Sequence, residues 1–140
     1  MQNLAQVFLE QLKAAEIPGI KNPTRYLVVD DDLQFGQTMK ELLTFCNPCL
    51  VDVVNAPDAA VSSVAQTIPY SRVFLDLNFP GKDSGVVAMK KIRAIMPSTP
   101  ITIISGAINE DFDTFAEEAK KYNISVLKKG FTINALMDVL

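Results

Sequence analysis

The sequence contains no histidine among its 140 residues. The chain therefore has no imidazole that could act as a general base, bind zinc or carry a phosphoryl group. Hydrolase triads and most zinc sites are excluded on this ground.

Long apolar runs and an excess of basic residues are also missing. No stretch reaches the roughly 18 apolar residues that a membrane helix needs, and the first twenty residues include Glu10 and Lys13 rather than a signal-peptide core. The net charge is -3, whereas nucleic-acid binding needs clustered Lys and Arg. We expect a cytoplasmic protein that binds neither membrane nor nucleic acid through this chain.

Only two cysteines are present, in the sequence Cys46-Asn47-Pro48-Cys49. Redox CxxC motifs open a helix and use its N-terminus to lower a thiol pKa, whereas this motif is predicted to close one. Two thiols without histidine also make at most half a zinc site. The pattern favours burial of both thiols as small hydrophobic side chains.

The composition is that of an ordinary folded domain, with 49% hydrophobic and 21% charged residues. From residue 25 onward, short apolar runs alternate with segments of helical periodicity. This alternation predicts an α/β fold, a three-layer doubly wound parallel sheet with right-handed crossovers. We expect strands at 26–29, 50–54, 73–77, 101–104 and 124–127, and helices at 33–46, 58–67, 85–96, 109–122 and 132–140.

Residues 1–24 are predicted to form a separate helical extension, followed by one domain over 25–140. Leu4, Val7, Phe8 and Leu12 fall at helical spacing, and Ile17-Pro18-Gly19 ends the pattern. Two interpretations are open. The helix packs on the domain, or it contacts a partner or a second copy of the chain in a homodimer.

Carboxylates follow two of the predicted strands. The first strand runs directly into Asp30, Asp31 and Asp32, and the strand that starts at Val73 contains Asp76. On its own, a run of three aspartates is typical of a turn and a helix N-cap, and we expect Asp32 to start the first helix. Because parallel strands deliver their carboxyl ends to one edge, the other carboxylates predict a cluster that requires a cation.

These segments together resemble the receiver domain of two-component response regulators, over about residues 25–140. The similarity rests on four motifs in order, each at the end of a predicted strand: Val28-Val29-Asp30-Asp31-Asp32, Phe74-Leu75-Asp76-Leu77-Asn78-Phe79-Pro80-Gly81, Ile104-Ser105-Gly106-Ala107 and Leu127-Lys128-Lys129-Gly130-Phe131. The resemblance implies a five-stranded sheet of order 2-1-3-4-5, in which the first and third strands meet at the ligand-binding crevice.

The resemblance also implies phosphoryl transfer onto Asp76 with Mg²⁺. Its implied metal ligands are Asp31 and Asp76 directly, Asp30 directly or through water, and the backbone carbonyl of Asn78. Ser105 and Lys129 would contact the phosphoryl oxygens. Lys128 is the rival of Lys129, but alternation along a strand lets only one of them face the crevice, and the family pattern selects Lys129.

Two positions depart from the family pattern. Gly130 replaces the proline that usually follows the lysine, so we expect either a trans peptide bond or retained strain. Val126 stands where an aromatic switch residue is usual, so a conformational response would have to proceed without a rotating ring.

Three functions are compatible with these observations. The first is a phosphoacceptor domain that takes its phosphoryl group from a histidine kinase or a phosphotransfer protein and regulates a downstream effector or output domain. Such a domain catalyses its own phosphorylation and dephosphorylation without being a classical turnover enzyme. The second is a receiver-fold interaction module that acts without phosphorylation. The third is a phosphatase-like hydrolase, for which the chain offers neither a lid nor a substrate domain.

Overall fold

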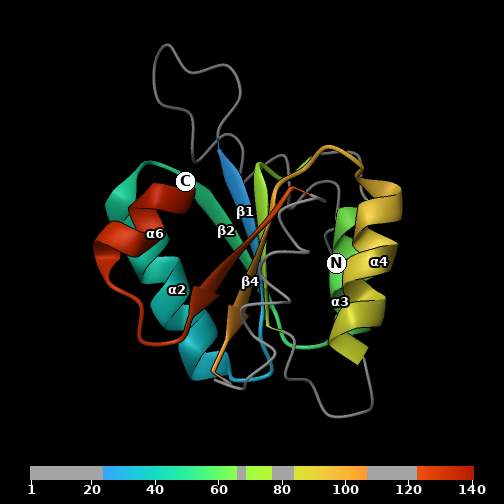
Figure 1. The fold of residues 1–140 in the computed structure, drawn as a ribbon, viewed down its shortest axis with the longest axis horizontal. Helices are drawn as coiled ribbons and strands as arrows, with labels where there is room; N and C mark the ends of the chain where they lie inside the picture. The colour runs from blue at the N-terminus through green and yellow to red at the C-terminus, as the bar shows by residue number, and fades with distance from the viewer. Residues whose placement is uncertain (1–23, 66–68, 77–83, 107–122) are drawn as a thin grey trace, which may run out of the picture.

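The computed structural model of the chain describes residues 24–65, 69–76, 84–106 and 123–140. Strands and helices alternate along these ranges (Figure 1). The strands are β1 (Arg25–Val29), β2 (Leu50–Val54), β3 (Arg72–Asp76), β4 (Ile101–Ser105) and β5 (Ile124–Lys128). The helices within the described ranges are α2 (Leu33–Cys46), α3 (Pro57–Val64), α4 (Ser84–Ile95) and α6 (Ile133–Val139).

The five strands form one parallel sheet of order β2-β1-β3-β4-β5, which confirms the predicted topology. In this sheet Val29 pairs with Leu75 and Asp76 pairs with Ile104. Because all strands run the same way, their carboxyl ends lie along one edge. β1 and β3 are neighbours there although β2 separates them in the sequence.

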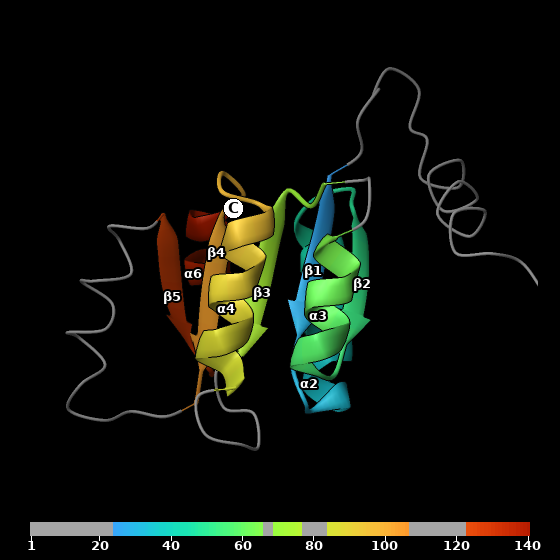
Figure 2. The ribbon, with the colours of Figure 1, turned by 90° about the vertical axis from the view of Figure 1, so that its right-hand side faces the viewer.

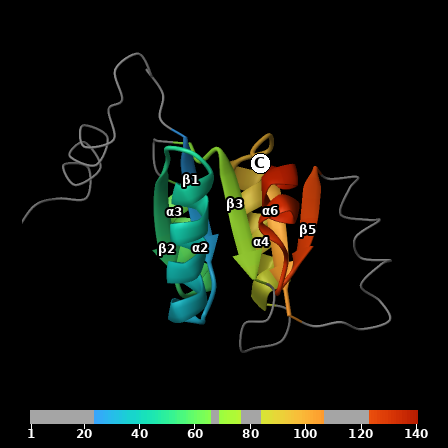
Figure 3. The same cartoon turned by 90° about the vertical axis from the view of Figure 1, so that its left-hand side faces the viewer.

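Helices cover both faces of the sheet, which confirms the expected three layers. α3 and α4 lie on one face (Figure 2), and α2 and α6 lie on the other (Figure 3). Successive residues of β1 alternate between two buried apolar clusters. Leu27 and Val29 pack with residues of α3 and α4, and Tyr26 and Val28 pack with residues of α2 and α6.

The first described helix, α2, has the bounds that the sequence predicts. It begins after Asp32, whose carboxylate accepts hydrogen bonds from the backbone N–H groups of Gln34 and Phe35. It ends at Cys46, before the C-cap residue Asn47. The Cys46–Cys49 motif therefore closes a helix as expected, and both half-buried thiols are free.

Other element bounds differ by a few residues from the prediction. α3 begins one residue early, at Pro57, because a proline in the first turn loses no helical hydrogen bond. It ends at Val64, short of the predicted end at 67. The expected N-terminal helix and the helix expected at 109–122 lie outside the described residues, so both stay predictions.

An ion pair between a buried arginine and a half-buried aspartate joins the start of β1 to the middle of β2. Nη2 of Arg25 lies 2.7 Å from Oδ2 of Asp52, and Nε donates to the same oxygen at 3.1 Å. The hydroxyl of Tyr70 donates to it as well, at 2.7 Å. Because 2% of the Arg25 side chain is exposed, its charge must be compensated within the protein, and Asp52 contributes to that compensation.

The loop after β5 departs from the family pattern at Gly130. The Lys129–Gly130 peptide bond is trans, and Gly130 has a φ of 88°, a left-handed conformation that favours glycine. Of the two outcomes expected at this position, the trans bond is the one observed.

Across the described ranges, no helix has the length and apolar character needed to cross a bilayer.

Candidate phosphoryl-transfer site

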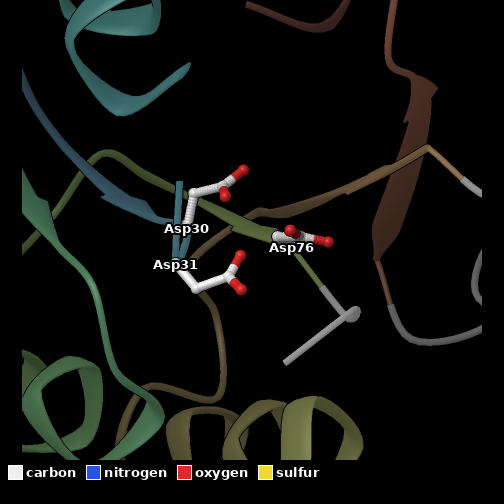
Figure 4. A group of neighbouring side chains, drawn as sticks. All are labelled: Asp30, Asp31 and Asp76. Carbon is white, nitrogen blue, oxygen red and sulfur yellow. The ribbon is translucent and has the colours of Figure 1, made fainter. Parts of the chain in front are cut away.

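The carboxyl edge of the sheet brings three carboxylates together. Asp30 directly follows β1, and Asp76 is the last residue of β3. One carboxylate oxygen from each of Asp30, Asp31 and Asp76 lies within 4.8 Å of the other two (Figure 4). Asp30 and Asp76 are buried, whereas Asp31 is exposed. Like charges at this separation repel strongly in a partly dry crevice, so the cluster favours a cation.

A tight turn at the start of α2 orients the first of these carboxylates. The backbone N–H of Asp32 donates to Oδ1 of Asp30 at 2.8 Å. Asp32 in turn uses its own Oδ1 to cap α2, at 3.0 Å from the nitrogen of Gln34 and 3.2 Å from that of Phe35. The third aspartate of the run therefore builds the turn, as the sequence predicts, while the other two contribute to the cluster.

Lys129, just after β5, supplies a positive charge to the cluster. Its Nζ lies 3.2 Å from Oδ2 of Asp30 and 3.4 Å from Oδ2 of Asp76. Burial alone would lower the pKa of Lys129, but the two carboxylates outweigh that effect and raise the pKa above its usual value. The ammonium therefore stays protonated at neutral pH. Of the two neighbouring lysines, the one at the cluster is thus Lys129, which the family pattern selects over Lys128.

The charge of Asp30 is only partly compensated. Burial raises the pKa of Asp30, and the charge of Asp76 raises it further, against the lowering effects of the Asp32 N–H group and of Lys129. The Lys129 contact to Oδ2 is close enough for an ion pair but is not aligned as a hydrogen bond, so no donor in the described structure satisfies this buried oxygen. A metal ion would satisfy it.

The residues present fit Mg²⁺. Magnesium prefers hard oxygen ligands and commonly uses one or two carboxylates together with water and phosphate oxygens. Three carboxylates converge here, one of them exposed and able to keep contact with water. A single lysine leaves the cluster with a net negative charge.

Two predicted site residues can be placed only in part. Ser105 is the last residue of β4, where it pairs in register with Lys128, so its backbone lies at the same edge as the cluster. Its side chain, and the whole of Asn78, lie outside the described residues. The proposed contacts of both groups stay predictions.

Sequence reasoning missed two residues that surround Lys129. The Lys129 ammonium lies 4.6 Å from the centroid of the Phe35 ring, within the range of a cation–π contact. A Cβ atom built on Gly106 would lie 3.4 Å from Cδ of Lys129. The lysine stem thus passes close to the backbone after β4, and its charged end rests against α2. No sequence pattern pairs residues so far apart.

The fold and this site together define a class of protein, and comparison with known families identifies it. The model for the response regulator receiver domain matches residues 26–140. The chain therefore belongs to the response regulator receiver domain family. Receiver domains as a class are phosphoacceptor signalling domains that bind Mg²⁺ in an acidic pocket and act between kinases and effectors.

Solved structures agree with this assignment. A receiver domain of the Francisella response regulator 1452 is 26% identical, with a TM-score of 0.68, and the match covers 84% of this chain and 93% of that one. A Rhodopirellula baltica structure described as an adenylate cyclase is 25% identical, with a TM-score of 0.70 and coverage of 83% of each chain. A CheY-like receiver domain protein from Methanospirillum hungatei shares the fold, at 16% identity and a TM-score of 0.68 over 84% of this chain and 90% of that one. Comparison with curated protein sequences finds no match.

Proposed function

We propose that Asp76 accepts a phosphoryl group and that the chain regulates a partner through the phosphorylated state. The observation that carries the proposal is the convergence of Asp30, Asp31 and Asp76 within 4.8 Å, with the Lys129 ammonium 3.4 Å from Asp76. A scaffold without chemistry would gain nothing from burying two like charges beside each other.

The reaction forms a bond between a carboxylate oxygen of Asp76 and phosphorus. The bond from phosphorus to the donor breaks, and its electron pair leaves with the donor group, a nitrogen or an oxygen. The nucleophile is already an anion, so no general base is needed. The contribution of the protein is alignment and charge compensation.

Asp30, Asp31 and Asp76 would hold Mg²⁺, with the backbone carbonyl of Asn78 as a neutral ligand. The bound ion would neutralise charge on the nucleophile and on the incoming phosphoryl oxygens. Lys129 lies within reach of Asp76 and would donate hydrogen bonds to one phosphoryl oxygen. Ser105 would donate its hydroxyl to another, and its movement toward the phosphate would start the conformational change.

A response through an aromatic rotamer is not part of the proposal. Val126 on β5 is half-buried and packs against the apolar cluster beneath α3 and α4. A branched aliphatic side chain in that position has no ring to rotate, so the response would have to proceed without one.

The phosphoryl donor must be another molecule, because the chain has no histidine of its own. We expect a histidine kinase or a phosphotransfer protein as donor, and a downstream effector or output domain as the regulated partner. A cytoplasmic location, a boundary between an extension at 1–24 and the receiver domain at 25–140, and homodimer formation through the extension stay predictions.

The test is incubation of the whole chain with Mg²⁺ and acetyl phosphate or phosphoramidate, followed by intact mass measurement. We expect a gain of one phosphoryl group that is absent when Mg²⁺ is chelated and absent in Asp76→Asn. Asp32→Asn is the matched control. It makes the same substitution in the adjacent turn, and asparagine also caps helices, so this variant should accept the group normally.

A second matched pair tests the lysine. Lys129→Met should slow phosphoryl uptake strongly, whereas Lys128→Met should not. If the wild-type chain binds Mg²⁺ but gains no phosphoryl group from either donor, the proposal is wrong. The chain would then be a receiver-fold interaction module that acts without phosphorylation.

A further inference from the structure

Lys129 is held from two directions by residues of one short segment, 30–35. Its ammonium contacts the Asp30 carboxylate at 3.2 Å and lies 4.6 Å from the centroid of the Phe35 ring. A lysine side chain has four rotatable bonds and would otherwise sample many positions at a crevice mouth. At 29% exposure it is neither fixed by burial nor fully solvated.

The same turn fixes both of these contacts. The backbone N–H of Phe35 donates to Oδ1 of Asp32, and the backbone N–H of Asp32 donates to Oδ1 of Asp30. The turn therefore fixes the Phe35 ring relative to the Asp30 carboxylate independently of Lys129. Phe35 is half-buried and packs against the apolar cluster beneath α2 and α6, which limits the freedom of its ring.

The third contact of Lys129, to Asp76 at 3.4 Å, is the one that phosphoryl transfer would change. A phosphoryl group added to that carboxylate would bring new oxygens near the ammonium, so the lysine must be close without being locked to Asp76. An aromatic face suits this task, because it attracts a cation without supplying an oxygen that competes with the phosphoryl group or with the metal ligands.

We infer that Phe35 is a positioning residue, whose ring keeps the Lys129 ammonium beside Asp76, ready for a phosphoryl oxygen. The inference deepens the proposed function and rests on it for the role of Lys129. It assigns a part in the reaction to a residue of α2 that itself touches neither the substrate nor the metal.

The first experiment does not depend on phosphorylation. The ε-methylene signals of Lys129 are assigned in a heteronuclear NMR spectrum by their loss in Lys129→Arg. We expect these signals to lie upfield of those of the other lysines because of the Phe35 ring current. They should keep this shift in Phe35→Tyr and lose it in Phe35→Leu.

Phe45→Leu is the matched control. It makes the same substitution on the same helix at a ring that is 78% exposed, and it should leave the Lys129 signals unchanged. If the wild-type signals lie among those of the other lysines, or if Phe35→Leu leaves them in place, the ring does not hold the ammonium and the inference is wrong.

The second experiment measures the rate of phosphoryl uptake at saturating Mg²⁺ while the donor concentration is varied. Phe35→Leu should lower the maximal rate about two- to tenfold, the range expected for one partly exposed cation–π contact, with little change in the donor concentration for half-maximal rate. Phe35→Tyr should keep the wild-type rate, because tyrosine also presents an aromatic face to the ammonium. A wild-type rate in Phe35→Leu overturns the inference.

The two experiments separate this inference from the proposed function. If the wild-type chain takes up no phosphoryl group, the proposed function fails, and the inferred role of Phe35 in the reaction fails with it. If the chain is phosphorylated but the NMR signals show no ring contact, the proposed function stands and the inference about Phe35 is wrong.

Discussion

Asp76→Asn should stabilise the metal-free protein while abolishing phosphoryl uptake. The substitution removes one of three clustered negative charges and keeps a carbonyl oxygen that can still accept a hydrogen bond. At an effective dielectric constant of about 20, like charges at the 4.8 Å limit of the cluster repel by about 3.5 kcal/mol, and closer charges repel more. Opposite charges 3.4 Å apart attract by about 5 kcal/mol.

The two repulsions felt by Asp76 therefore exceed its attraction to Lys129 by about 2 kcal/mol. Solvent at the exposed Asp31 and at the partly exposed Lys129 screens this difference. The Asp76 side chain is 2% exposed, and removal of a charge from so buried a position also stabilises the folded state. We expect the free energy of unfolding to rise by about 1–3 kcal/mol.

The assay is urea unfolding of the wild-type chain and of Asp76→Asn, first with chelator and then along a Mg²⁺ series. Binding to the folded state should stabilise the wild-type chain by about 2.7 kcal/mol at a hundred times the dissociation constant. The wild-type chain should thus overtake the variant as Mg²⁺ increases. Asp138→Asn, at an exposed carboxylate on α6 outside the cluster, should stay within about 0.5 kcal/mol of the wild-type chain throughout.

The reasoning is refuted if Asp76→Asn is less stable than the wild-type chain without metal. That result would mean that the attractions acting on the Asp76 carboxylate exceed both repulsions. The carboxylates would then form a satisfied ion-pair network with no need of a divalent ion, and the electrostatic basis of the proposed Mg²⁺ site would be lost.

Three further predictions concern residues outside the cluster. Asp52→Ala should lower the free energy of unfolding by about 3–5 kcal/mol in urea titrations, because it removes the Asp52 ion pair from the buried Arg25 guanidinium. A loss below about 1 kcal/mol would show that this ion pair behaves like an exposed one. Gly130→Ala should lower the free energy of unfolding by about 1–2 kcal/mol in the same assay through left-handed strain alone, since a Cβ there meets no atom within 4 Å. Gly130→Pro should lower it more, because proline fixes φ near -65°. Burial raises the pKa of the Cys49 thiol, so a smaller fraction of Cys49 is thiolate at pH 8 than for an ordinary cysteine. Cys49 should therefore react more slowly with a disulfide reagent in the folded protein than in urea. Its reaction rate should keep rising with pH above the usual thiol pKa.

The fold was predictable because local signals in this chain agree with one another. Apolar runs of strand length end at aspartate, serine or lysine, and helical periodicity lies between them. The bounds of α2 follow from Asp32 at one end and from the Asn47-Pro48 turn at the other. Where the sequence signals were weaker, the observed bounds differ from the predicted ones. Nothing in the sequence after Val64 marks the end of α3, and the prediction ran past it.

The carboxylates and lysine of the site were predictable for a different reason. Parallel strands place their carboxyl ends at one edge whatever the details of packing, so strand-end residues converge by topology. Alternation at the end of β5 allows only one of Lys128 and Lys129 to face the crevice, and the family pattern selects Lys129. The approaches of Phe35 and Gly106 to Lys129 were not predictable, because they depend on how far the end of β5 lies from α2 and from the residue after β4. No periodicity in the sequence records these distances.

The charge balance of the crevice explains why the site combines charged residues with an aromatic ring. Three carboxylates and one ammonium leave a net charge of about -2 in the described part of the site, so an anionic phosphoryl group would be repelled until a divalent ion restored neutrality. A second lysine would remove only about half of that net charge and would occupy the carboxylate oxygens that a metal needs. An aromatic ring beside the single lysine fixes the ammonium without adding charge or ligands. The arrangement therefore leaves the carboxylates available to a metal while keeping one cation ready for the transferred group.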